Sequence, residues 1–376
     1  MNNSISRRET RQVMVGDVAI GGGAPISVQS MTTAPTRDTQ AVVNQIKSLA
    51  QLGVEIVRVA VPDMDSVKAL GKIVEVSPVP VVADIHFDPE LALVALKASV
   101  HKLRLNPGNI RKKSDIRRIA EEASKLSVPI RIGVNSGSIP GDLRDRYGGV
   151  NRESMWASAR RHLDLLEASG FRDIVLSLKS SDPMLTVAAN RMASAECDYP
   201  LHLGVTEAGP QLTGSVRSTV ALTLLLSEGI GDTIRISLSG NPEKEPAVAW
   251  EILSSLAIRR RFPRLVCCPT CARSRIDVEK LALSVQQHLA GIEGDFTLAI
   301  MGCEVNGPGE AREADIALIG TPSGVQLFID GKNTGELEMS DLVGHLDKAV
   351  DSYIREKRGT SGGYGSGCKE NNSDST

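Results

Sequence analysis

Three cysteines in the last third of the chain are spaced as metal ligands. Cys268 and Cys271 form a C-x-x-C pair, and Cys303 lies farther along the sequence. A C-x-x-C turn can direct two thiolates at one centre, and a distant third thiolate can close the site. A tetrahedral zinc site or a four-iron cluster needs four ligands, and the remaining cysteines offer none at a matching spacing. We therefore expect the fourth ligand to be another residue type, water or substrate.

An incomplete thiolate set is typical of a metal site with an exchangeable position, because structural zinc sites are usually closed. Glu310, in a glycine-rich loop after Cys303, is the nearest oxygen donor in the sequence. A structural zinc completed by His288 and a redox dithiol are the alternatives. The spacing by itself fits zinc and an iron–sulfur cluster equally well.

A second set of polar residues follows or ends apolar runs in the first two thirds of the chain. Arginine suits bidentate contacts with phosphate, and lysine supplies a point charge. Five members of the set are cationic, so the set predicts a site for a diphosphate-sized anion. The alternative is that some cations pair with Asp84 or Glu207, or face surrounding helices. The set comprises Arg58, Asp84, His86, Arg104, Asn106, Arg131, Asn135, Lys179, Thr206, Glu207, Arg235, Ser237 and Ser239.

The apolar runs that would position these residues alternate with helical stretches. Each run is short, rich in β-branched residues and bounded by Gly, Pro, Asn or Asp, as buried parallel strands are. Eight strands alternating with eight helices indicate an α/β fold of the (β/α)₈ TIM-barrel type, which places its chemistry at the carboxyl ends of the strands. An open doubly wound sheet would carry a glycine fingerprint after its first strand, and none is present. The runs span residues 26–31, 56–61, 79–85, 102–105, 130–134, 174–178, 201–205 and 233–238.

The pattern predicts two domains. Residues 1–258 form the barrel, preceded by a small hairpin over 11–15 and 18–20 that would plug its base. Residues 259–266 are an arginine-rich linker, and residues 267–358 form a small α+β domain with strands at 296–301, 316–319 and 325–329. A turn follows at Asp330-Gly331, and the Gly/Ser-rich residues 359–376 are expected to be a disordered tail.

Composition excludes several classes of protein. The 376 residues carry 43 basic and 45 acidic side chains, for a net charge of −2, and only 3% are aromatic, which disfavours nucleic-acid binding. Six cysteines are too few for a disulfide scaffold. The polar stretch from Met1 to Arg11 has no apolar core like that of a signal peptide, and the longest apolar runs are far short of a membrane span. We expect a cytoplasmic protein with reduced thiols.

Several motifs, in this order along the chain, match one family. They are Gly21-Gly22, Pro25 to Thr32, Val57-Arg58-Val59, Asp84 to Phe87, Lys102 to Asn109, Arg131 to Asn135, Gly204 to Gly209, Cys268 to Cys271, and Gly302-Cys303 through Asn306 to Glu310. With these motifs the chain resembles the bacterial 4-hydroxy-3-methylbut-2-enyl diphosphate synthases, the iron–sulfur reductases of the methylerythritol phosphate route to isoprenoids.

The resemblance implies a [4Fe-4S] cluster held by Cys268, Cys271, Cys303 and Glu310. It also implies a homodimer in which the cluster domain of one subunit covers the barrel mouth of the other. Flavodoxin or ferredoxin would donate electrons. The substrate would be 2-C-methyl-D-erythritol 2,4-cyclodiphosphate, which is opened and dehydroxylated with two electrons.

Applied to the strand ends, the resemblance gives each residue an expected role. The diphosphate would bind Arg58, Arg104, Arg131, Lys179 and Arg235, with Asn106, Asn135 and Ser237 as hydrogen-bond donors. Glu207 is the first candidate proton donor and His86 the second. Glu310 is counted as catalytic as well as a ligand, because release of its carboxylate would open a position on the cluster.

Two other functions fit the residue pattern. One is a pterin- or phosphosugar-binding barrel transferase with a structural zinc appendage. The other is a metal-dependent regulatory protein that binds a phosphorylated metabolite without catalysis.

Overall fold

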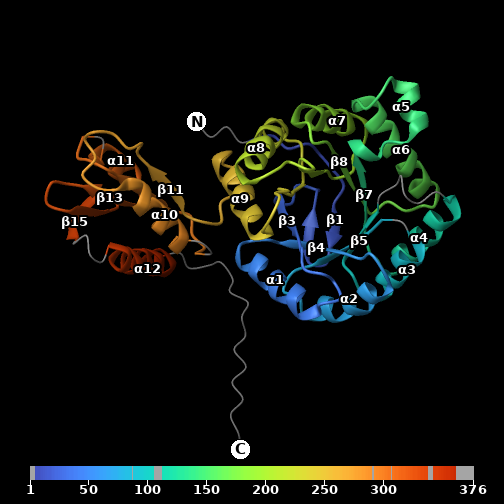
Figure 1. Ribbon diagram of the computed structural model, residues 1–376, viewed down its shortest axis with the longest axis horizontal. Helices are drawn as coiled ribbons and strands as arrows, with labels where there is room; N and C mark the ends of the chain where they lie inside the picture. Colours follow the sequence, from blue (N-terminus) through green and yellow to red (C-terminus); the bar gives the residue numbers. More distant parts are fainter. Residues whose placement is uncertain are drawn as a thin grey trace, which may run out of the picture. The chain divides into compact units, whose positions relative to one another are not determined.

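The computed structural model describes residues 5–86, 88–105, 112–289, 292–305, 307–337 and 342–360. The chain divides into two compact units, Met1–Arg260 and Arg261–Thr376 (Figure 1). Each unit has its own sheet and its own core.

The first unit is a parallel barrel. Its eight strands are ordered β8-β7-β6-β5-β4-β3-β10-β9, and a parallel bridge between Leu176 and Leu201 joins the two ends of this row. This confirms the barrel that the alternating pattern predicted. The strands are β3 (Ser27–Met31), β4 (Ile56–Ala60), β5 (Val81–Ile85), β6 (Lys102–Leu105), β7 (Ile130–Asn135), β8 (Ile174–Lys179), β9 (His202–Leu203) and β10 (Thr233–Ile234).

Two of these strands are shorter than predicted, because the runs over 201–205 and 233–238 leave the regular ladder early. At Gly204 the backbone passes so close to the next strand that a Cβ atom would lie 2.4 Å from the carbonyl oxygen of Arg235. The close approach of these two backbone segments replaces the regular pairing of β9 with β10. It also brings the residues after β9 and β10 to the barrel mouth.

Helices surround the barrel as an outer ring (Figure 1). Asp63 and Asp182 cap α2 and α7 by accepting backbone N–H bonds, and Asn151 begins α6 with a capping box. Helix α5 is an addition to the eight helices expected, and lies between β7 and α6. The helices are α1 (Thr39–Gln51), α2 (Met64–Val76), α3 (Pro89–Lys97), α4 (Lys113–Lys125), α5 (Gly141–Tyr147), α6 (Arg152–Ala168), α7 (Pro183–Glu196), α8 (Gln211–Ser227) and α9 (Glu245–Ser255).

The predicted hairpin is present as β1 (Val13–Val15) and β2 (Val18–Ile20), paired antiparallel. Its buried Val15 and Ile20 pack with Ile56 and Val82 near the amino ends of β4 and β5. The hairpin therefore closes the base of the barrel, at the opposite end from the polar strand ends.

The second unit is a five-stranded mixed sheet with helices. Its strands are ordered β11-β12-β13-β14-β15, with β11 to β13 parallel and the last two pairs antiparallel. The core includes Val285, Ile300, Leu318 and Leu346. The elements are β11 (Arg264–Cys267), α10 (Val278–Leu289), β12 (Thr297–Met301), α11 (Gly307–Glu313), β13 (Ile316–Gly320), β14 (Val325–Ile329), β15 (Lys332–Leu337) and α12 (Leu342–Thr360).

Two boundary predictions in this unit were wrong, and one strand was missed. Residues 264–266 belong to strand β11 and not to a linker, because they pair with β12. Beyond the predicted turn at Asp330-Gly331, where both residues have positive φ, the chain returns as β15, which the polar sequence concealed. Helix α12 continues to Thr360, past the predicted start of the tail, and residues 361–376 lie outside the described part of the chain.

Candidate functional site: the barrel mouth and the cysteine loops

Adjacent strands of the barrel bring the predicted cations together. The register places Asp84 of β5 beside Arg104 of β6, and Arg104 beside Arg131 of β7. Residues paired in this way share one face of the sheet, and alternation along each strand sends these side chains into the barrel. Arg104 and Arg131 are 4% and 1% exposed, so both charges lie within the barrel and away from bulk water.

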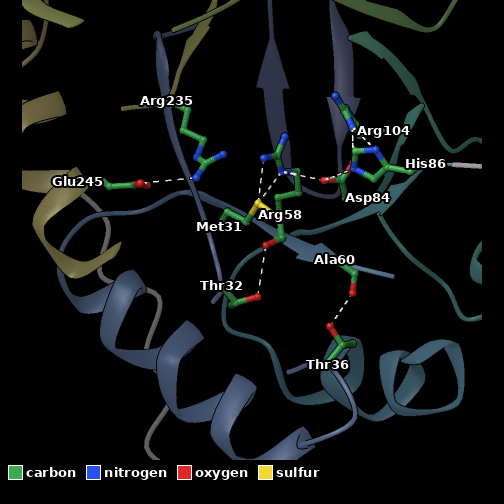
Figure 2. A network of polar contacts seen from close by, with 10 residues as sticks. All are labelled: Met31, Thr32, Thr36, Arg58, Ala60, Asp84, His86, Arg104, Arg235 and Glu245. Atoms are coloured by element: carbon green, nitrogen blue, oxygen red, sulfur yellow. Dashed lines mark hydrogen bonds and ion pairs between the residues drawn. The ribbon is translucent and has the colours of Figure 1, made fainter. Parts of the chain in front are cut away.

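Asp84 is the carboxylate around which this network is built (Figure 2). Its oxygens lie 2.9 Å from Arg104 Nη1, 3.5 Å from Arg58 Nε and 3.4 Å from His86 Nε2. Burial opposes ionisation of Asp84, but the charges of Arg58 and Arg104 and the hydrogen bond with His86 outweigh it and hold its pKa well below the ordinary value. The alternative that Asp84 would pair with some of the cations is therefore correct for Arg58 and Arg104.

Arg58 also contacts the thioether of Met31. Its Nε and Nη2 lie 3.1 and 2.8 Å from Met31 Sδ, so the guanidinium lies between a sulfur atom and Asp84 (Figure 2). Burial lowers the pKa of Arg58 to about 9, with Asp84 opposing the shift and Arg235 and Arg104 adding to it. The group therefore remains charged at neutral pH.

Arg235 directly follows β10 and contacts a second buried carboxylate (Figure 2). Its Nη2 lies 3.5 Å from Glu245 Oε1, and the same carboxylate accepts bonds from Ser30 Oγ at 2.8 Å and from the backbone N–H of Leu238 at 3.1 Å. Glu245 begins helix α9 and is 3% exposed. The contacts of Glu245 connect the segment that contains the half-buried Ser237 to β3 and α9.

Lys179 ends β8 next to Asn135 of β7 in the register. Gly204 gives it room, since a Cβ atom there would be 2.9 Å from Lys179 Nζ, and Gly133 does the same for Arg104, whose Nε would be 3.0 Å away. Burial, followed by the charges of Arg131 and Arg235, lowers the pKa of Lys179 well below its ordinary value.

Polar atoms remain unpartnered in this interior. Among the described residues, Arg131 Nε and Nη1, Arg104 Nε and Arg235 Nε are buried without a hydrogen-bond partner. Buried donors of this kind are costly unless water or a ligand completes them. The cations outnumber the contacting carboxylates Asp84 and Glu245, so the mouth can accept a multiply charged phosphate ligand.

The two predicted proton donors lie at the edge of this mouth. His86 is 45% exposed at its side chain and contacts both Asp84 and Arg104, whose Nη1 lies 3.0 Å from His86 Nε2. Glu207 is exposed and has a φ of 53°, a left-handed conformation that is strained for a residue with a side chain. Asn106 lies outside the described residues.

Three contributors to the mouth were missed by the sequence reasoning. Met31 and Glu245 hold Arg58 and Arg235, and Lys102 lies on β6 two residues before Arg104. Alternation along β6 places Lys102 on the same face as Arg104, which was a usable signal. Met31 and Glu245 gave no such signal, because a thioether and a first-turn helix glutamate are ordinary residues until the tertiary structure brings the guanidinium groups to them.

The cysteine loops lie at neighbouring strand ends of the second unit. Cys268 follows β11, Cys303 follows β12, and these strands are adjacent and parallel. The thiol of Cys268 accepts a bond from the backbone N–H of Gly302 at 3.1 Å, and the backbone N–H of Arg275 donates to the Gly302 carbonyl at 2.7 Å. The loop that contains Cys271 is thereby tied to the loop that contains Cys303.

The donor chemistry fits an iron–sulfur centre, although the ligands are not gathered. Cys268 and Cys303 are half-buried, Cys271 and Glu310 are exposed, and Glu310 lies on the short helix α11. Cysteine thiols at neighbouring strand ends are the ligands that such a cluster uses, and a backbone N–H directed at a sulfur atom is a contact that tunes it. Among the residues described, no three His, Cys, Asp or Glu side chains are close enough together to hold a metal ion.

The other cysteines lie elsewhere. Cys197 caps the end of α7 in the barrel, where its thiol donates to the carbonyl of Ala193. Cys267 is the exposed last residue of β11, and Cys368 lies outside the described residues. His288 contacts Asp347, with 2.7 Å between Nε2 and Oδ1. The partner that the structure gives this imidazole is therefore a carboxylate and not a cysteine thiol.

The first unit is a parallel barrel with a cationic mouth, and the second is a small sheet domain with cysteine loops. Together they define a class of two-domain barrel proteins. Family comparison identifies the class more closely. The GcpE TIM-barrel domain matches residues 10–250, and the GcpE protein C-terminal domain matches residues 264–352. The chain belongs to the GcpE family, which confirms the predicted resemblance.

Curated relatives agree with the family match. The chain is 50% identical over 351 residues to a 4-hydroxy-3-methylbut-2-en-1-yl diphosphate synthase (flavodoxin) of Lawsonia intracellularis, covering 93% of this chain and 98% of that one. It is 47% identical to the protein of the same name from Geobacter sulfurreducens, covering 93% and 99%. Among solved structures, a 3-dehydroquinate dehydratase from Geobacillus kaustophilus aligns with a TM-score of 0.49 at 13% identity, covering 68% of this chain and 100% of that one.

Proposed function

We propose that the chain forms 4-hydroxy-3-methylbut-2-enyl diphosphate by reductive ring opening and dehydroxylation of 2-C-methyl-D-erythritol 2,4-cyclodiphosphate. The curated relatives reported above bear the name of this synthase, and the similarity covers 93% of the chain. The oxidoreductase activity that the motifs implied is thereby confirmed, and the transferase and regulatory alternatives are not favoured. The roles of individual residues that follow are part of the proposal.

The assignment of substrate-binding residues rests on the excess of buried cations at the mouth. Four of these cations, Arg58, Arg104, Arg131 and Lys179, converge there from four strands, and Arg235 follows directly after β10. Asp84 and Glu245 fix three of them without neutralising the set. We assign the diphosphate of the substrate to these side chains, with Asn135, Ser237 and Asn106 as further donors.

Proton delivery is assigned to the rim. Loss of a hydroxyl group as water needs a proton at the departing oxygen, and a carboxylic acid or an imidazolium can supply it. Glu207 remains our first candidate, because its strained backbone holds an acid in the segment that follows β9. His86 is the second, because Arg104 and Asp84 fix its ring.

An iron–sulfur cluster of the [4Fe-4S] type is proposed at the cysteine loops. Cys268, Cys271 and Cys303 would bind it, with Glu310 as the fourth ligand. When bound, such a cluster supplies electrons one at a time. Flavodoxin is the proposed donor, as the printed name of the relatives indicates, with ferredoxin as the alternative.

A homodimer is also proposed, and an exposed apolar stripe supports it. Leu212, Val216 and Val220 recur every four residues on α8, and they are 80%, 55% and 42% exposed. Such a stripe on the outer ring is suited to contact with a second copy of the chain. Val216→Glu should convert a dimer to a monomer in analytical ultracentrifugation, and a wild-type protein that is monomeric at every concentration would contradict the proposal.

No helix in the described part of the chain is long and apolar enough to cross a membrane. A cytoplasmic location is proposed because none of the cysteines in the described part of the chain forms a disulfide, as expected in a reducing compartment.

The test is an anaerobic assay of the purified protein with the cyclic diphosphate and an artificial one-electron reductant. We expect 4-hydroxy-3-methylbut-2-enyl diphosphate as product and a brown protein that contains iron. A colourless protein with stoichiometric zinc and no product would overturn both the cofactor and the reaction. Glu207→Gln should retain the colour and lose turnover, and full activity in this variant would remove Glu207 from the mechanism.

A further inference from the structure

Lys102 is a buried lysine to which the binding assignments above give no role. It lies on β6 two residues before Arg104, so its side chain enters the barrel one layer closer to the base. The residue is 0% exposed, and its Nζ has no hydrogen-bond partner among the described residues. An ammonium group in this position is expensive unless an anion compensates it.

The titratable and charged groups that face Lys102 are cationic or can become so. Burial, followed by the charges of Arg131 on β7 and Arg58 on β4, lowers the pKa of Lys102 well below its ordinary value. His202 of β9 is 0% exposed, and both of its ring nitrogens are unpartnered. Burial and then Lys179, Arg131 and Lys102 lower the pKa of His202 as well.

The nearby carboxylate is already engaged. In the register, Val82 of β5 lies beside Lys102, and Asp84 lies one inward-facing position higher, beside Arg104. Asp84 is shared by Arg58, Arg104 and His86 at 2.9 to 3.5 Å. Lys102 therefore has cations for neighbours and no acid of its own among the described residues.

The proposed reaction changes the charge of the bound diphosphate. In the cyclic substrate each phosphorus carries one ionised oxygen, so the ligand is a dianion. Ring opening frees a second ionisable oxygen on the terminal phosphorus, so the product is a trianion above the second phosphate pKa. The step balances as substrate dianion plus two electrons and one proton giving product trianion and one water.

We propose that Lys102 is a positioning residue that acts through Arg131 and takes up a proton from solvent when a highly charged diphosphate occupies the mouth. This inference rests on the proposed function. When the mouth is empty, a neutral amine at Lys102 avoids repulsion with the neighbouring cations. When the ligand is bound, an ammonium group beneath Arg131 attracts the ligand more strongly as the negative charge of the ligand grows. Lys102 would therefore favour the trianionic product, and the transition state that leads to it, over the dianionic substrate.

The experiment is calorimetric titration of the full-length protein with inorganic diphosphate at about pH 8, where an ordinary lysine would already be charged. Two buffers of different ionisation enthalpy give the number of protons taken up on binding. We expect the wild type to take up about one proton more than Lys102→Met, since the linked proton is lost with the amine. Diphosphate binding should weaken roughly tenfold in the variant.

Lys125→Met is the matched control, because Lys125 on α4 is a lysine whose side chain is 71% exposed. It should match the wild type in proton uptake and in affinity. Equal uptake in Lys102→Met and the wild type would overturn the inference, as would loss of the proton in His202→Gln with Lys102 intact.

A second measurement does not need Lys102→Met to fold. In wild-type protein labelled with ¹³C at lysine Cε, two buried lysines can give such signals, Lys102 and Lys179. The signal that remains in Lys179→Met belongs to Lys102, and in the wild type it should shift from its neutral to its charged position when diphosphate is added. Signals that stay unchanged under saturating diphosphate would contradict the inference. No diphosphate binding at all would instead refute the assignment of the mouth in the proposed function, so the two failures are distinguishable.

Discussion

The barrel mouth and the cysteine loops differ in how much of each site the polypeptide completes by itself. In the mouth, Asp84, Met31 and Glu245 hold the guanidinium groups within a buried network (Figure 2). At the cysteine loops, the thiols and Glu310 are exposed or half-buried at the end of a sheet and do not form a closed set in the described residues. Rigid strands can hold an anion site in advance, whereas ligands on loops depend on the bound group to draw them together.

The largest effect is expected at the cysteine loops. Cys303→Ser should abolish turnover and the brown colour, because the proposed cluster loses a thiolate. Binding of inorganic diphosphate should be unchanged, since the mouth lies in the other unit. Cys197→Ser is the control and should retain iron and activity. Full activity in Cys303→Ser would show that turnover does not need this thiolate, and it would contradict the cluster proposed at the cysteine loops.

Asp84→Asn should cost about 3 kcal/mol of stability, because it leaves two buried guanidinium groups without their carboxylate. The pKa of Asp84 is lowered in the folded state, so its contribution is present above the unfolded pKa of about 4 and declines as the pH falls below it. Urea unfolding of both proteins at several pH values measures this. A stability difference that stays constant from neutral to acidic pH would contradict the assigned ion pairs.

Arg131→Met should weaken diphosphate binding roughly a hundredfold, since a charged hydrogen-bonding group is lost. The same change should raise the melting temperature of the free protein, because it removes a buried charge whose Nε and Nη1 have no partner. Calorimetric titration and thermal unfolding measure the two quantities. A variant that is less stable and still binds normally would show that Arg131 is structural.

The smallest effect is expected at Met31. Replacing its sulfur in Met31→Leu removes the acceptor for Arg58 and should raise KM about threefold, with kcat unchanged. Met31→Gln supplies an amide oxygen in place of the sulfur and should restore much of the affinity. If both variants behave alike, the contact with Arg58 does not position it.

The extent of sequence-based prediction also differed between the two units. The barrel strands were recognisable because parallel strands that are buried on both faces read as short β-branched runs. Strand β15 was missed because all but the last of its residues are exposed and polar, so its pairing with β14 leaves no apolar signature. The linker prediction failed at Arg264, because arginine is common in connecting segments and only the pairing with β12 identifies a strand.

The sequence by itself determined the alternation of strands and helices, the cations at the strand ends and the spaced cysteines, because these follow from local periodicity and residue chemistry. Only the tertiary structure decided which cations are held and which are left unpartnered. Met31 and Asp84 reach Arg58 from separate strands, and Glu245 reaches Arg235 from a helix. Lys102 lies among cations because barrel closure directs side chains from all strands toward one axis. Burial and charge at that axis arise from residues distant in sequence, so no local pattern could have revealed them.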